Sequence, residues 1–206
     1  MTKFRLICAA AIMLAATGTA AFATTFTLDF DNDPIAGGLS TLTSVDSPLV
    51  TFSSTDASGV VAVTTIASAT ANPQLATAAN VPAGLRMEFS VLVDSLSMLF
   101  GNDDPNFAED RAILSVFNNG TKLGETVLIY NKNDLADQTI SISGLGGFDA
   151  ATLFYADATG APVSVLAEVV DNVTFNTVAP VPLPAAGWML VVALGGMAVM
   201  RRRTGS

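Results

Sequence analysis

The chain has 206 residues, of which 50% are hydrophobic and only 13% are charged, with no histidine and a single cysteine. About 25% charged residues is usual for a soluble domain. This composition excludes a long disordered chain, a disulfide-linked scaffold and a catalyst that depends on histidine. All 18 acidic residues lie between Asp29 and Asp171 with only four basic ones, so this part has a net charge of 4 − 18 = −14. Such a chain is unsuited to nucleic acid, and no nucleic-acid partner is expected.

Residues 1–23 have the features of a secretory signal peptide. A basic start is followed by an apolar stretch, and Ala21 and Ala23 supply the small side chains of a cleavage site. The apolar stretch is much shorter than the ~20 residues of a spanning helix, although a buried N-terminal helix remains the alternative. We expect cleavage after Ala23, which would remove the only cysteine, Cys8.

The C-terminal end predicts a short membrane span over residues 186–200 and a basic cytoplasmic tail over residues 201–206. The sixteen residues from Ala185 to Met200 carry no charge. As a helix they would be about 24 Å long, shorter than a hydrocarbon core of about 30 Å. The stop-transfer residues are Arg201, Arg202 and Arg203. The span is adequate for stopping transfer and poor as a permanent anchor.

Three prolines make residues 179–185 a stiff, extended segment ahead of this span. The segment, the short helix and the arginine cluster together resemble the VPLPA type of PEP-CTERM sorting signal. The resemblance implies an exosortase partner, transient residence in the inner membrane, removal of the helix and tail, and transfer to the cell surface or extracellular matrix. The alternative is a proline-rich linker before an ordinary anchor. The sorting motif consists of Val181, Pro182, Leu183, Pro184 and Ala185.

Residues 24–178 predict an all-β domain, an antiparallel β-sandwich of the jelly-roll type, because hydrophobic residues alternate with period two between turn signals. Asn118-Asn119-Gly120 predicts a hairpin, and residues 102–105, 144–147 and 159–162 predict loops. Irregular structure is expected in three segments, residues 36–43, 53–59 and 67–79. The expected strands are 26–30, 60–66, 87–93, 96–100, 112–117, 125–130, 140–142, 151–155, 163–170 and 172–176.

The aromatic and acidic first strand, Phe-Gly-Asn-Asp at 100–103 and Val-Asp-Asn-Val-Thr-Phe at 170–175 give a further resemblance. They resemble the galactose-binding or carbohydrate-binding-module jelly rolls that often precede PEP-CTERM signals. The resemblance implies a module that contacts a ligand or the matrix. We expect a non-enzymatic surface or matrix protein associated with the envelope or exopolysaccharide. The alternative function is a carbohydrate-binding module with a structural calcium ion.

No enzymatic motif is present, because the four glutamates lie in no recognisable arrangement and the mature chain lacks histidine and cysteine. Calcium needs only oxygen ligands. Asp171 has the strand parity of core residues, and pairing of the first and last strands would bring Asp29 or Asp31 close to it. The hypothesis is a structural Ca²⁺ held by Asp29, Asp31 and Asp171. The alternative is that Asp171 caps a bulge or turn and the other two are solvated.

Aromatic residues in loops are the candidates for a sugar platform, and Phe107 and Phe148 fit that description. The acidic segment 102–110 predicts either a second cation or sugar site, or a solvated loop. The acidity of the domain disfavours anionic polysaccharide unless calcium bridges the two.

Overall fold

The computed structural model describes residues 23–65, 74–77, 83–101, 111–131, 133, 135–163 and 168–179. The predicted signal peptide up to residue 22, with Ala21, lies outside these residues, and so do the sorting motif, the span and the tail from residue 180 onward. Throughout the described ranges the regular elements are β-strands, and no helix there is long and apolar enough to cross a membrane.

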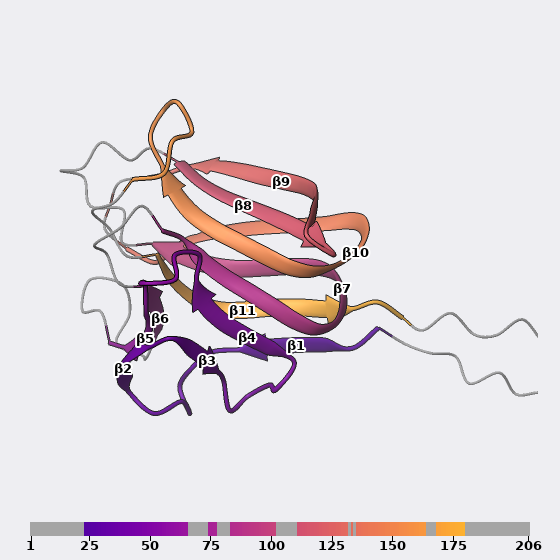
Figure 1. Cartoon of the computed structure of the whole chain (residues 1–206), viewed down its shortest axis with the longest axis horizontal. Helices are drawn as coiled ribbons and strands as arrows, with labels where there is room; N and C mark the ends of the chain where they lie inside the picture. The colour runs from indigo at the N-terminus through magenta and orange to yellow at the C-terminus, as the bar shows by residue number, and fades with distance from the viewer. Residues whose placement is uncertain are drawn as a thin grey trace, which may run out of the picture. The chain divides into compact units, whose positions relative to one another are not determined.

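The strands form one connected antiparallel sheet in the order β2-β5-β6-β11-β7-β10-β8-β9, in which β1 pairs with β11 and the β3–β4 hairpin pairs with β7. This confirms the all-β, antiparallel prediction (Figure 1). The strands are β1 (Thr25–Leu28), β2 (Ala36–Leu39), β3 (Thr41–Thr43), β4 (Val50–Ser54), β5 (Val61–Thr64), β6 (Gln74–Thr77), β7 (Leu85–Gly101), β8 (Arg111–Asn118), β9 (Thr121–Ile129), β10 (Gln138–Ala156) and β11 (Val169–Thr177).

Two long strands, β7 and β10, belong to both layers of the sandwich (Figure 1). The first half of β7 pairs with β4 and with the second half of β10, which also pairs with β8. The second half of β7 pairs with β11 and with the first half of β10. The two layers are therefore continuous through β7 and β10.

Where each long strand passes from one layer to the other, the side chains that face the core change between odd-numbered and even-numbered positions. In β7 the buried residues are odd-numbered up to Phe89 and even-numbered from Leu96 onward. The pairing of β10 with β7 shifts register between Ser143 and Phe148, where three glycines have positive φ. A bulge of this kind bends a strand and re-aims its side chains. The predicted breaks at 94–95 and 144–147 are thus bulges inside continuous strands, and the prediction of a loop at 144–147 was wrong.

The core lies between the layers and is rich in aromatic rings. Phe89 of one layer packs edge-on against Phe175 of the other with ring centroids 5.2 Å apart, and it also meets Phe148 at 6.0 Å. Phe30 and Phe52 form a further edge-to-face pair at 5.6 Å. Aromatic pairs in this geometry add about 0.5–1.5 kcal/mol beyond the area that they bury.

The pairing of the first and last strands is confirmed, with Phe26 of β1 opposite Phe175 of β11. The Asn118-Asn119-Gly120 hairpin is confirmed as well. Asn119 and Gly120 both have positive φ, at 47° and 76°, which is the conformation of a type I′ turn between β8 and β9.

Strands β2, β3 and β6, and the end of β4, fall in segments that were expected to be irregular. Their residues are small or polar, and each strand has only three to five residues, so period-two alternation is too short to detect. Neighbouring strands supply their stability. Of the predicted strand 163–170 the structure describes Val163, Glu168, Val169 and Val170, and among these Val169 and Val170 belong to β11.

The bulge in β10 depends on Gly147, whose φ is 98°. A Cβ atom there would lie 3.1 Å from Val178 Cγ2. Gly147→Ala should therefore lower the free energy of unfolding by about 1–3 kcal/mol, measured by urea denaturation. Gly37→Ala is the control, because its Cβ would meet only Ala62 Cβ at 3.9 Å. Equal losses in the two variants would contradict a special role for Gly147.

Candidate functional site

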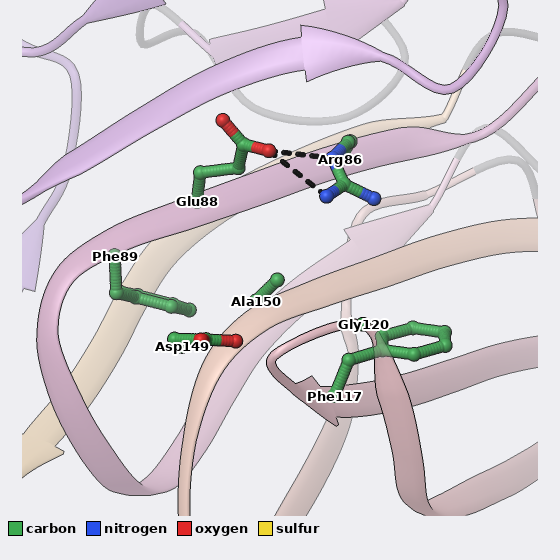
Figure 2. A pocket seen from close by; sticks show the side chains of 7 residues that line it. All are labelled: Arg86, Glu88, Phe89, Phe117, Gly120, Asp149 and Ala150. Atoms are coloured by element: carbon green, nitrogen blue, oxygen red, sulfur yellow. Dashed lines mark hydrogen bonds and ion pairs between the residues drawn. The ribbon is translucent and has the colours of Figure 1, made fainter.

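A hollow of about 410 Å³ opens on the outer face of the layer formed by β4, β7, β10, β8 and β9 (Figure 2). It combines charged side chains with an aromatic ring, as binding sites for small polar ligands commonly do. The residues that line it are Arg86, Glu88, Phe89, Phe117, Gly120, Asp149 and Ala150.

Strand register places three of these residues in one row across the sheet. Ala150 of β10 lies directly opposite Glu88 of β7 on one side and Phe117 of β8 on the other. Because side chains of directly paired residues point to the same face, the row sets a methyl group between a carboxylate and a phenyl ring. The short side chain of Ala150 leaves the depression between them.

Arg86 and Glu88 stand two positions apart on the same face of β7 and form an ion pair. Arg86 Nε and Nη2 donate to Glu88 Oε1 at 3.0 and 2.9 Å. The side chains are 40% and 59% exposed, so the pair contributes at most about 1 kcal/mol to stability. Within the described part of the chain Glu88 Oε2 accepts no hydrogen bond, and it is therefore available to a ligand.

The opposite wall of the hollow is fixed by the β8–β9 turn. The Asn119 backbone N–H donates to both carboxylate oxygens of Asp149, at 3.2 and 3.0 Å. Asn118 Nδ2 donates to the Gly147 carbonyl at 2.9 Å. These bonds hold the turn against β10, so the half-buried Phe117 ring and the Asp149 carboxylate keep their places beside the hollow.

The predicted metal residues lie at a second place, where β1 meets β11. Asp171 is only 4% exposed, and its Oδ1 accepts the N–H of Asn172 at 2.7 Å. Asn172 has a φ of 48°, and the pairing of β11 with β7 shifts register between Asp171 and Thr174. Asp171 thus points inward at a bulge, as its parity predicted.

The charges of Asp29 and Asp31 act on Asp171. Burial raises the pKa of Asp171, the N–H of Asn172 opposes that rise, and the negative charges of Asp31 and Asp29 raise it further. Among the described residues, no three acidic side chains are arranged to hold a metal ion. The calcium hypothesis for Asp29, Asp31 and Asp171 stays a prediction.

The sugar-platform hypothesis was wrong for Phe148, which is fully buried and packs against Phe89. The bulge before Phe148 turns its ring inward, although the glycines around it suggested an exposed loop. Phe107 and the acidic segment 102–110 lie outside the described residues. Sequence reasoning missed Phe117. Every residue of β8 from Ala112 to Val116 is buried, so no alternation singles out Phe117, and its outward face follows only from the pairing that sets it in one row with Ala150 and Glu88.

No family model matches the chain, and comparison with curated proteins finds no relative. Solved structures share its fold. An arabinose-bound GH51 α-L-arabinofuranosidase is similar with a TM-score of 0.50 and 11% identity over 79% of this chain, which spans 27% of that enzyme. The K1 adhesin domain of Lys-gingipain from Porphyromonas gingivalis has a TM-score of 0.46 and 12% identity, over 76% of this chain and 99% of the domain.

A third similar structure contains the CBM22-1 and GH10 modules of Clostridium thermocellum xylanase 10B with xylohexaose. Its TM-score is 0.32 with 10% identity, over 81% of this chain and 30% of that one. At these identities the likeness concerns the fold alone.

The raised pKa of Asp171 makes stability depend on pH. A carboxyl group whose pKa is raised in the folded state binds its proton more readily when the protein is folded. The free energy of unfolding therefore falls as the pH rises from 3.8, the ordinary pKa, through the raised pKa of the folded state. Asp171→Asn keeps an oxygen that can accept the N–H of Asn172. It should raise the melting temperature at neutral pH, and this gain should vanish below about pH 3.8. Asp46→Asn, an exposed site, is the charge-matched control; an equal gain there would contradict the explanation.

The wild type and the Asp171→Asn variant also test whether calcium binds at this place. If Asp171 helps to hold Ca²⁺, millimolar Ca²⁺ will raise the melting temperature of the wild type relative to chelator and leave Asp171→Asn unchanged. An unchanged melting temperature of the wild type would rule the site out.

Proposed function

We propose that this protein is an exported, non-enzymatic surface or matrix protein whose sandwich binds polysaccharide in the hollow beside Phe117. Export by the signal peptide and sorting by an exosortase through Val181–Ala185 deliver it to the cell surface. The observation that carries the binding role is the row Glu88, Ala150 and Phe117, flanked by Arg86 and Asp149.

The chemistry of the hollow suits a sugar. A pyranose ring has an apolar face of C–H groups, which can pack on the Phe117 ring, and a rim of hydroxyl groups that both donate and accept. Glu88 Oε2 and Asp149 offer acceptors, and the guanidinium of Arg86 offers further donors beyond those used by Glu88. The hollow is only partly enclosed, so a polymer could lie across it without inserting a chain end.

The two carboxylates of the hollow support binding rather than hydrolysis. A glycosidase needs one carboxyl group kept protonated by an apolar environment. Glu88 is exposed and paired with Arg86, and Asp149 accepts the backbone N–H of Asn119. Neither group has the surroundings of a general acid.

Phe117→Ala should weaken binding to extracellular polysaccharide from the producing bacterium by about threefold to tenfold, because it removes the ring that packs on the sugar. Affinity gel electrophoresis measures the change. Phe26→Ala is the control, since it removes a half-buried ring from β1, in the other layer. A wild type that binds no such polysaccharide, or equal weakening in the two variants, would overturn the proposed site.

The sorting proposal predicts where the processed chain ends. Intact mass spectrometry of the protein from cells with the exosortase should show a chain that ends within or just after Val181–Ala185, and cells without the enzyme should retain residues 186–206. If Arg201–Arg203 persist in the presence of the exosortase, the C-terminal segment is an ordinary anchor.

A further inference from the structure

The charges that face the hollow do not balance. Glu88 and Asp149 supply two carboxylates, and Arg86 supplies the only cation among the lining residues. Arg86 is already paired with Glu88. Beside Phe117, Lys122 of β9 is paired with Glu125, so these two add no net charge. Within the described ranges of the chain, one negative charge, that of Asp149, therefore has no cationic partner at the hollow.

Asp149 has acceptor capacity to spare. A carboxylate offers about four lone-pair sites. The N–H of Asn119 is its hydrogen-bond donor among the described residues, and a single N–H leaves most of those sites free. Figure 2 shows Asp149 beside Ala150 and Phe89, and Glu88 and Phe117 line the same hollow. A ligand that donates several hydrogen bonds and carries positive charge would meet an unfilled acceptor there.

The charge of the whole domain acts in the same direction. Residues 24–178 carry a net charge of 4 − 18 = −14. A field of this sign repels polymers that carry carboxylate, sulfate or phosphate groups, and it attracts cationic ones. The effect reaches about 10 Å at 0.1 M salt.

We infer that the hollow binds a polysaccharide with protonated amino groups, that is, a polymer of amino sugars that are at least partly free of N-acetyl groups. The ammonium group donates up to three hydrogen bonds and lies against Asp149. The apolar face of the same sugar packs on Phe117, and hydroxyl groups of the neighbouring unit meet Arg86. This inference rests on the proposed function, because it specifies the polysaccharide bound at that site.

Isothermal titration calorimetry of the full-length protein tests it with three soluble probes: a glucosamine oligomer with free amines, the same oligomer fully N-acetylated, and a polyuronate. At a pH that protonates the amines, the free-amine oligomer should bind about five- to tenfold more tightly than its N-acetylated form. The polyuronate should not bind. The preference should shrink at 1 M salt, where the screening length is about 3 Å.

Asp149→Asn retains an acceptor for the Asn119 N–H and removes the charge. It should abolish most of the preference for the free-amine oligomer while binding of the N-acetylated oligomer persists. Asp46→Asn changes the net charge equally, away from the residues that line the hollow, and should leave the preference in place.

The outcomes separate the two proposals. Equal binding of the two oligomers, tighter binding of the polyuronate, or an equal effect of Asp46→Asn would overturn the inference and leave polysaccharide binding intact. Failure of every probe, together with failure of the native extracellular polysaccharide, would overturn the proposed function itself.

Discussion

The passage of β7 and β10 from one layer to the other is the constraint on which the rest of the structure depends. The core lies on one side of the first half of each strand and on the other side of its second half. Each strand must therefore change the face on which it carries its apolar side chains. The change of parity in β7 and the glycine-rich bulge in β10 achieve this. Because the two bulged regions are paired with each other, Phe148 lies opposite Val93 and both are fully buried. A break in either strand would separate the layers that Phe89 and Phe175 join.

The same constraint builds the hollow. Asp149 lies within a second register shift, between Phe148 and Ala150, and the second half of β10 separates β7 from β8. Gly147 lies in the bulge, outside the paired positions of β10 and β7, and its carbonyl accepts a hydrogen bond from the Asn118 side chain, which ties the β8–β9 turn to this end of the sheet. A regular strand would lack that free carbonyl. The ligand-facing side chains are therefore positioned by the device that also closes the sandwich, and backbone geometry rather than a mobile loop sets their spacing.

Sequence reasoning found what depends on local patterns. The period of two, the Asn-Asn-Gly turn and the inward parity of Asp171 are properties of short segments, and the structure confirms them. What it could not find depends on pairing between distant segments. The bulge that buries Phe148 exists because β10 must follow β7, and the hollow exists because Ala150 falls between Glu88 and Phe117, residues far apart in the chain. Sequence reasoning looked for a ligand-binding aromatic residue in loops, whereas Phe117 lies near the end of strand β8.

The pairing of β1 with β11 brings the two ends of the domain together. Thr177 donates its backbone N–H to the Thr24 carbonyl at 3.0 Å, and Val178 donates to the Leu92 carbonyl at 2.9 Å, beside the bulge of β7. A Cβ on Gly147 would touch Val178, and Asp149 is only two residues beyond Gly147. The hollow therefore lies at the end of the sandwich from which the chain continues toward residue 180. The bulged region of β7 and β10 thus holds the end of β11 and one wall of the hollow together, so a change at Gly147 would disturb both.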